Sequence, residues 1–412
     1  MTSSRTFISL AAKIAALLLL ASAPALLAQG GTQDNTSVSS VVSANNQFAF
    51  DFYRGINATN AGKNIFVSPY SISTALAMTF EGSRNNTRKQ MASVLHFDLP
   101  DADRQAGFSE LLAQTRPGPG KKYKLDVANG LWGQKDYPFE PAFTGTIGKF
   151  YGGGFNTVDY AGDKEGAIHT INTWVEGKTA GKIKNLIHLD DVTPLTRLVL
   201  TNAIYFKGDW ASPFEKSASK DEAFHTTETQ KVQAPMMHQT AHFKFVKETG
   251  IAAIELPYSG DDLSMIVLLP DSNIDKIGED LSLERIQKLR TGMRLAEVDV
   301  TLPRFKFETR YILNDQLGKM GMPDAFDEFL ADFSGMNGKK SLYISKVIHQ
   351  AMIDVNEEGS EAAAATAVVM SQKMARIEMK ETFRADHPFI FMIVHNTTGS
   401  ILFMGRLSNP VS

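Results

Sequence analysis

Residue types that often carry enzyme chemistry are present, but their spacing nominates no active site. The chain lacks the Gly-x-Ser-x-Gly elbow of hydrolases and the Gly-x-x-x-x-Gly-Lys-[Ser/Thr] loop that cradles phosphate. Gly177-Lys-Thr-Ala-Gly181-Lys182 has the wrong spacing for such a loop. The absence of cysteine excludes disulfides, thiol catalysis and cysteine-ligated metals. A triad built from distant Ser, His and Asp residues remains an alternative, but we predict no catalytic residue.

Two histidines have the spacing of a zinc-binding pair. His238 and His242 stand four residues apart, so on one helix both could face the same metal ion. However, Phe243 and Phe245 alternate beside them as residues of a strand do, and no glutamate follows His238. We interpret the pair as ordinary surface histidines and predict no metal site and no cofactor.

The most unusual stretch is 356–372, which contains a run of alanine at 362–365. One interpretation is a helix, because Ser360 would cap it and alanine has the highest helix propensity. The alternative is a strand, because β-branched residues follow from Thr366 and a strand-like run, 341–355, precedes it. With period two, the face that starts at Ser360 carries no charge. Such a segment could leave a loop and enter a sheet as a half-buried strand.

The rest of the chain must supply a fold that positions this segment. Helical patterns cover 39–56, 71–80, 88–95, 105–114 and 165–177. Strand patterns cover 197–206, 253–256, 263–269, 297–307, 390–394 and 401–404. These patterns predict a mixed α+β fold. No internal repeat and no long Pro/Gly/Ser linker divides the 412 residues, which favours a single domain.

The N-terminus has a different pattern. Residues 1–28 combine Arg5 and Lys13 with an apolar run and small residues, which is typical of a secretory signal peptide. A membrane anchor is the alternative, but the run is shorter than the roughly 20 residues of a span and Pro24 interrupts it. We therefore predict a secreted protein, periplasmic or extracellular, whose mature chain starts with a flexible lead-in at 29–40.

The composition narrows the classes of partner. The 42 basic and 45 acidic residues nearly balance, so charge gives no argument for a nucleic-acid partner. Outside the N-terminus no stretch is apolar enough to cross a membrane, and we predict no membrane partner. A hydrophobic content of 43% excludes global disorder.

Several motifs in the chain resemble those of one family. The run from Phe383 to Ile393 resembles the C-terminal signature of the serpins, and Phe403-Met-Gly-Arg406 and Asn409-Pro410 follow as they do in serpins. The stretches 64–71, 201–210 and 234–237 are similar to other serpin motifs, in the family's order. The resemblance implies a single serpin domain at 29–412 with three β-sheets, about nine helices and an exposed reactive loop at about 357–382.

The resemblance also implies a function, the inhibition of a serine protease by a loop that acts as a suicide substrate. The hinge of inhibitory serpins is matched by ten consecutive residues, Glu357, Glu358, Gly359, Ser360, Glu361, Ala362, Ala363, Ala364, Ala365 and Thr366. The family's usual spacing from Glu357 places the scissile bond at Lys373–Met374, and Arg376–Ile377 is the alternative. Both bonds suit a trypsin-like protease. Met374 departs from the small residue that many members have after the bond.

In the implied mechanism the cleaved loop enters the main sheet as a strand and traps the acylated protease. Other matched positions have structural roles in this event. Ser68, Ser71, Asn202 and His349 resemble the family's polar cluster beneath the opening sheet, called the shutter. Trp210 and Arg304 match the region where the loop enters, called the breach, and Arg304 is expected to pair with Glu357.

Two other functions remain open. A non-inhibitory serpin would act as a binding protein or chaperone, although the uncharged inserting face argues against it. An exported hydrolase would need a triad that no motif indicates. A glycosaminoglycan cofactor has weak support, because the matching helix, 105–116, holds Arg116 as its only basic residue; Lys121, Lys122 and Lys124 lie beyond a turn. We expect a monomer.

Overall fold

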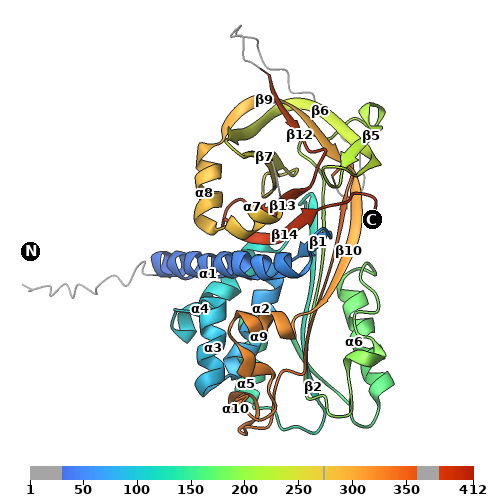
Figure 1. The fold of residues 1–412 in the computed structure, drawn as a ribbon. Helices are drawn as coiled ribbons and strands as arrows, with labels where there is room; N and C mark the ends of the chain where they lie inside the picture. The colour runs from blue at the N-terminus through green and yellow to red at the C-terminus, as the bar shows by residue number, and fades with distance from the viewer. Residues whose placement is uncertain (1–29, 272–273, 360–379) are drawn as a thin grey trace, which may run out of the picture.

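The computed structural model describes residues 30–271, 274–359 and 380–412, which form two networks of paired strands with helices around them (Figure 1). The first network is a five-stranded sheet in the order β10-β11-β4-β2-β3. Its strands are β2 (Tyr123–Gln134), β3 (Gly154–Val158), β4 (Leu198–Gly208), β10 (Phe305–Ile312) and β11 (Lys346–Val355). The central pair, β4 and β11, is parallel.

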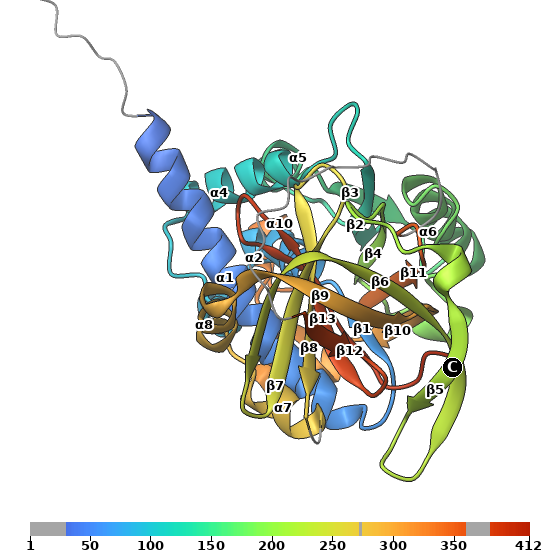
Figure 2. The ribbon, with the colours of Figure 1, turned by 90° about the horizontal axis from the view of Figure 1, so that it is seen from above.

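The second network has nine strands and is joined through one long strand. The order is β1-β14-β13-β8-β7-β6-β9-β12, and β5 pairs with β6. Their bounds are β1 (Ile65–Val67), β5 (Lys220–His225), β6 (Lys231–Glu248), β7 (Ile251–Pro257), β8 (Leu263–Pro270), β9 (Arg294–Pro303), β12 (Glu381–Arg384), β13 (Phe389–His395) and β14 (Ile401–Leu407). The first part of β6 pairs with β5 and β9, and its end pairs with β7. Figure 2 shows β6 and β9 crossing the top of the molecule. Divided at β6, this network and the five-stranded sheet make the three expected sheets.

The described residues contain ten α-helices, close to the nine expected. They are α1 (Gly30–Thr59), α2 (Pro69–Gly82), α3 (Asn85–Leu95), α4 (Asp101–Thr115), α5 (Pro141–Phe150), α6 (Lys164–Lys178), α7 (Ile274–Asp280), α8 (Leu283–Gly292), α9 (Asn314–Met320) and α10 (Ser334–Asn337). In Figure 1, α6 covers one face of the five-stranded sheet, and α2 and its neighbours lie on the other. None of the helices in the described ranges has both the length and the apolar character of a membrane span.

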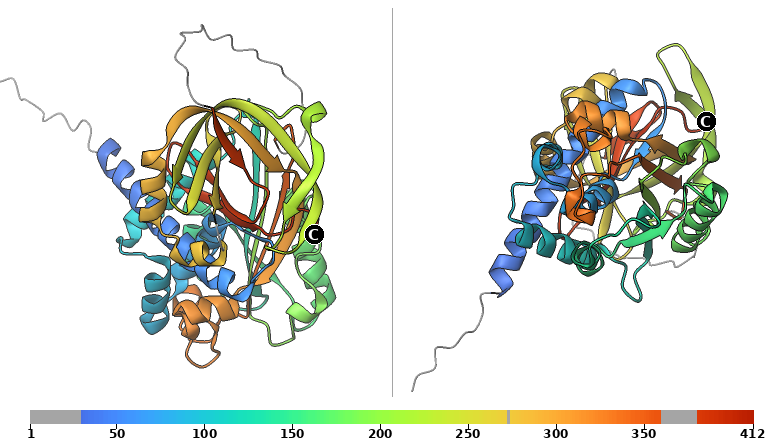
Figure 3. Two further views of the ribbon diagram at one scale, coloured as in Figure 1. Left: turned by 45° about the horizontal axis from the view of Figure 1, so that its top comes forward. Right: turned by 90° about the horizontal axis from the view of Figure 1, so that it is seen from below.

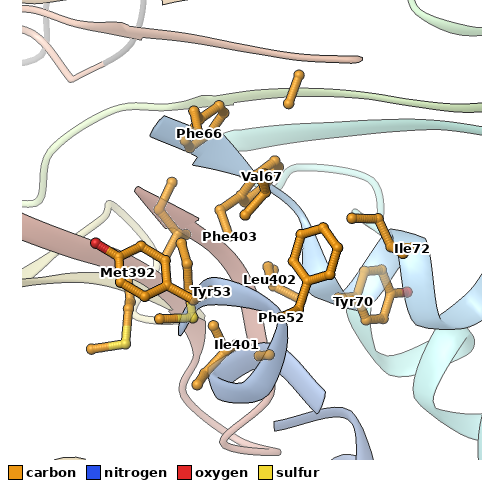
Figure 4. Close-up of a cluster of buried hydrophobic side chains, with 14 of the residues drawn as sticks. Phe52, Tyr53, Phe66, Val67, Tyr70, Ile72, Met392, Ile401, Leu402 and Phe403 are labelled. Atoms are coloured by element: carbon orange, nitrogen blue, oxygen red, sulfur yellow. The ribbon is translucent and has the colours of Figure 1, made fainter. Parts of the chain in front are cut away.

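The core lies where α1 and α2 meet β1, β13 and β14 (Figure 4). Nearly every residue of α2 is buried, as its apolar sequence predicts. The ring of Phe66 stacks on Phe403 with centroids 5.0 Å apart and an interplanar angle of 3°. Ser68 caps α2 by accepting a hydrogen bond from the Ser71 N–H, and Pro69 occupies the first turn. This cap also fixes the two serines that take part in the polar cluster described below.

The predicted flexible lead-in at 29–40 is wrong beyond its first residue, because α1 already begins at Gly30. Val38 and Val41, three positions apart, are buried, and α1 packs against α4. Gly107 on α4 allows this approach, since a Cβ there would lie 2.7 Å from the Ser37 carbonyl oxygen. Polar composition suggested a loop, but tertiary packing on α4 makes the segment helical. The predicted signal peptide, 1–28, lies outside the described residues.

Candidate functional site

A group of polar side chains lies in the core where β2, β4 and β11 run side by side. His349 on β11 is in register with Asn202 on β4, and Asn202 is in register with Asn129 on β2. Ser68 and Ser71 approach from the start of α2. All five side chains are buried. The four residues predicted to form a cluster therefore meet, and we call the five residues together the polar cluster.

The side chains of the polar cluster bond to one another and to the backbone of β14. The Asn202 Nδ2 group donates to Ser71 Oγ at 2.7 Å and to Asn129 Oδ1 at 2.5 Å. Ser71 Oγ donates to Asn129 Oδ1 at 2.9 Å, and Ser68 Oγ donates to the Leu402 carbonyl at 2.7 Å. An unpaired buried polar group costs about 1–3 kcal/mol, so these bonds fix α2 and three strands relative to one another.

His349 is held as a neutral imidazole. Its Nε2 accepts a hydrogen bond from the Ser68 N–H at 3.1 Å, so the ring proton sits on Nδ1 and is donated to Asn202 Oδ1. Complete burial lowers the pKa of His349 to about 3. The histidine is consequently uncharged at neutral pH, and a proton added to Nε2 would break its bond to Ser68.

Asn129 is the member of the polar cluster that the sequence analysis missed. It stands in Val127-Ala-Asn-Gly130, a stretch assigned to neither a helix nor a strand. In the structure this stretch lies within β2, next to β4 along eleven register pairs. A buried asparagine inside a strand-forming run is the signal that could have identified it, because such a side chain needs polar partners.

The two central strands pair directly over seven residues of each. Lys346–Met352 of β11 is in parallel register with Val199–Tyr205 of β4. Both strands then continue, β4 to Gly208 and β11 to Val355. Figure 3 shows the long strands of this sheet beneath the crossing β6 and β9. An additional strand between β4 and β11 would have two neighbours to pair with.

A tight turn follows β11 at this end of the sheet. The N–H of Asn356 donates to the Gly359 carbonyl at 2.8 Å, and the N–H of Gly359 donates back at 3.1 Å. The turn is bound to the segment that follows β4. The Trp210 N–H donates to the Glu358 carbonyl at 3.0 Å, and Trp210 Nε1 donates to the Asn356 carbonyl at 3.0 Å. The first residues of the predicted hinge thus connect the ends of β11 and β4.

The turn requires glycine at 359. Gly359 has φ +120°, a conformation that residues with a Cβ rarely adopt. A Cβ there would lie 2.2 Å from the Gly208 carbonyl oxygen and 2.6 Å from the Trp210 nitrogen. The backbone of residues 208–210 therefore fills the space that a side chain would need.

The two hinge glutamates are held differently. Glu357 is buried, with 4% of its surface exposed, and its carbonyl accepts from the Phe214 N–H at 2.8 Å. Its Oε1 lies 3.8 Å from the Arg304 guanidinium, the partner expected from the sequence. Glu358 forms an ion pair with Lys216, whose ammonium is exposed. Hydrogen bonding to Glu358 raises the pKa of Lys216, although solvent screens such a pair.

Trp210 supports the turn from the side of β4. Its ring is stacked on Tyr258, with centroids 4.6 Å apart and an interplanar angle of 12°. Burial raises the pKa of Tyr258 far above its usual range, so the phenol stays neutral. Trp210 and Arg304 are thus both beside the turn, where the resemblance placed them.

The remaining predicted hinge residues, 360–366, lie outside the described residues. The same holds for both candidate scissile bonds, Lys373–Met374 and Arg376–Ile377. Their roles therefore stay predictions.

His238, one of the two histidines considered as a zinc-binding pair, has contacts at both ring nitrogens. His238 lies on β6 in register with Thr301 of β9. Its Nε2 is 2.8 Å from Glu222 Oε1, and its Nδ1 is 3.2 Å from Thr301 Oγ1. Both ring nitrogens therefore have protein partners.

The comparisons with known proteins decide the family. A model described as serpin, serine protease inhibitor, matches residues 43–410. The chain belongs to the serpin family. The leukocyte elastase inhibitors of Xenopus tropicalis and Homo sapiens are 43% and 42% identical to this serpin, each over 89% of its chain and 99% of their own. A crystal structure of uncleaved ovalbumin has a TM-score of 0.81 at 30% identity, over 90% of this serpin and all of that chain.

These matches confirm the predicted serpin fold. The family's description also places this serpin among protease inhibitors rather than catalysts, as predicted.

The predicted localisation, secreted, periplasmic or extracellular, is wrong by the same comparison. Both leukocyte elastase inhibitors are matched over 99% of their own length, and the family model begins at residue 43 of this serpin. These relatives therefore have no counterpart of residues 1–28, on which the prediction rested. The apolar run and its basic residues indicated export. The relatives that match the rest of the chain lack such a segment, and they therefore point away from a secreted localisation.

Proposed function

We propose that this serpin inhibits a serine protease as a suicide substrate, through a reactive loop at about 357–382. The observation that carries the proposal is the direct pairing of β4 with β11, together with a hinge turn at one end of that pair. A chain that leaves the turn after Gly359 can reverse its direction and enter between the two strands, antiparallel to both. The family supports inhibition, and the loop chemistry follows from the sequence.

In the proposed reaction the protease treats Lys373–Met374 as a substrate bond. The serine hydroxyl of the protease adds to the Lys373 carbonyl, and the bond to the Met374 nitrogen breaks. The amine of Met374 leaves with the proton that the protease's histidine took from the serine. Lys373 is then joined to the protease as an ester, and the segment from Ser360 to Lys373 is free at its far end.

Strand insertion would supply the driving force. Fourteen residues at about 3.3 Å each reach roughly 45 Å, comparable with a long strand of the sheet. At about 0.5–1.5 kcal/mol net for each new backbone hydrogen bond, the gain is roughly 7–20 kcal/mol. A gain of this size is comparable with the stability of a whole domain. It is enough to move the attached protease and distort its active site before water hydrolyses the ester.

The class of the target protease is the part of this proposal on which the sequence and the relatives differ. A lysine at the scissile bond favours a trypsin-like protease, and Arg376–Ile377 would favour the same class. The two relatives compared above are named for elastase instead. The prediction of a monomer and the weakly supported glycosaminoglycan cofactor also stay predictions.

The test is to incubate the full chain separately with trypsin and with an elastase. We expect an SDS-resistant adduct with trypsin, and N-terminal sequencing of the released fragment should begin at Met374. A fragment that begins at Ile377 would move the bond to Arg376–Ile377. An adduct that forms with elastase alone would overturn the trypsin-like specificity. If both proteases cleave the chain and neither forms an adduct, the proposed inhibition is overturned.

A further inference from the structure

The predicted reactive loop, at about 357–382, runs into β12, and few backbone contacts hold this strand. Among the described strands β12 pairs with β9 alone, through Glu381–Arg384 beside Val298–Thr301. Figure 1 shows β12 at the top of the molecule, near β9 and β6. Phe383 is buried and packs edge-on against Phe245. A four-residue parallel ladder is short, so the polar side chains of β12 must supply part of its attachment.

Arg384, the last residue of β12, joins the strand to two carboxylates. Its Nη2 donates to Glu222 Oε2 at 2.5 Å, and its Nε donates to Asp386 Oδ2 at 2.8 Å. The half-buried Glu222 lies on β5, and its other oxygen contacts His238 and the exposed Lys220. Burial alone would raise the pKa of Glu222, but the bonds from Arg384 and His238 lower it, so the carboxylate is ionised. Arg384 thus ties β12 to β5, a strand with which it forms no ladder.

His387 lies between two groups that can only accept hydrogen bonds. Its Nδ1 is 2.9 Å from Asp386 Oδ1, and its Nε2 is 2.8 Å from the Pro270 carbonyl oxygen at the end of β8. A neutral imidazole has a single N–H, so both bonds form only when both ring nitrogens carry a proton. The bond to Asp386 raises the pKa of His387, burial opposes this, and the nearby Asp271 adds to it. His387 is therefore an imidazolium in this arrangement.

The two parts of this network meet at Asp386. Its carboxylate accepts from both Arg384 and His387, and its backbone carbonyl accepts from the His225 N–H of β5 at 2.7 Å. When His387 loses its proton, Asp386 loses a positive neighbour, and only one of the two histidine bonds can remain. The contribution of His387 is fully present below its ordinary pKa of 6.5 and is lost as the pH rises through the raised value.

We propose that Arg384 and His387 are positioning residues for the inhibitory reaction, because they hold β12 in the sheet and so fix where the reactive loop returns to the fold. The predicted scissile residue, Lys373, stands only eight positions before Glu381. A loop fixed at both ends presents its bond to a protease at a lower entropic cost than a loop fixed at the hinge alone. The attachment of β12 stands by itself, whereas its effect on protease attack rests on the proposed function.

The attachment is tested by hydrogen exchange of the β12 amides at pH 7.0, measured by mass spectrometry on the full chain. We expect Arg384→Gln and Glu222→Gln each to speed this exchange about two- to fivefold. The double variant should add little to either, because the two residues act through one contact. Arg294→Gln is the matched control, since Arg294 lies outside the part of β9 that pairs with β12. Unchanged exchange in Arg384→Gln, or an equal change in Arg294→Gln, would overturn the attachment.

The role of His387 is tested by repeating the exchange at pH 6.0 and 9.0, with the chemical exchange rate at each pH divided out. The native β12 amides should lose protection at pH 9.0. His387→Arg, which keeps a cation at both values, should retain protection, whereas His387→Gln should lack it at both. A pH response that persists in His387→Arg would overturn the role of His387, and would leave that of Arg384 intact.

The effect on inhibition has a separate measurement, the rate constant for adduct formation with trypsin. Arg384→Gln should react about two- to fivefold more slowly than the native chain. Both proteins are compared at the same pH, so that the pH profile of the protease cancels in their ratio. Equal rates together with faster exchange would overturn the positioning role and leave the attachment. If the native chain forms no adduct, the proposed inhibition fails, and the exchange results still decide whether the network holds β12.

Discussion

His349 links the stability of the uncleaved fold to pH. The residue is fully buried, and its pKa is lowered from 6.5 to about 3. The unfolded chain therefore binds more protons than the folded chain between these two values, and stability rises with pH across that window. The stabilising contribution is fully present above about pH 6.5 and is lost as the pH falls toward 3. The loss amounts to roughly several kcal/mol at the acid end.

We predict that His349→Gln removes most of this dependence. Glutamine has no proton to gain in the window, although its amide can accept from the Ser68 N–H and donate to Asn202. The measurement is the urea unfolding free energy of both proteins at pH 7.0 and 4.5. The native protein should lose at least about 1 kcal/mol more than the variant over this interval. Parallel losses would contradict a neutral buried histidine.

Gly359 is a second residue that the structure does not allow to be replaced without strain. We predict that Gly359→Ala destabilises the uncleaved protein by roughly 2–3 kcal/mol, because its Cβ would collide with the Gly208 carbonyl. The turn should also open, which limited proteolysis near the hinge would detect as faster cleavage. Gly177→Ala on α6 is the control. A Cβ there meets no atom within 4 Å, so this variant should be stabilised by up to about 1 kcal/mol. Equal effects would contradict the steric argument.

At the scale of the element, the inserting strand should tolerate charge on one face only. With period two, Ser360 belongs to the face that would be buried and Glu361 to the opposite face. We predict that Ser360→Arg converts the inhibitor into a cleaved substrate, because the guanidinium would be buried without a partner. Glu361→Arg should still form the adduct. Gel analysis after protease challenge separates the two, and a stable adduct with Ser360→Arg would contradict strand insertion.

The elements also show where local patterns suffice. The predicted helix 71–80 lies within α2, and the predicted strand 263–269 lies within β8, because both are continuous apolar runs with clear ends. β2 was missed, since small and polar residues such as Asn129 and Gly130 weaken its alternation. Its strand structure comes from the eleven register pairs with β4, which no local pattern contains.

At the scale of the whole molecule, insertion would turn a five-stranded sheet into a six-stranded one. The proposed mechanism requires the uncleaved form to be held kinetically, because the inserted form is lower in free energy. We predict that cleavage within the reactive loop raises the temperature of thermal unfolding by roughly ten degrees or more. Differential scanning calorimetry of uncleaved and cleaved protein measures this shift. The cleaved Ser360→Arg variant serves as the control and should show a much smaller shift.

The sequence alone determined the family, through motifs in a fixed order, and it also predicts a hinge of small uncharged residues. Both are local properties, because they depend only on residue type and on spacing along the chain. Only the tertiary structure decided which side chains meet. Ser68 and His349 are 281 residues apart in the chain and form one hydrogen bond. Asn129 completes their cluster because β2 lies against β4, and Gly359 must be glycine because the backbone of 208–210 crosses beside it. Such contacts depend on strand order and register, which side-chain periodicity does not encode.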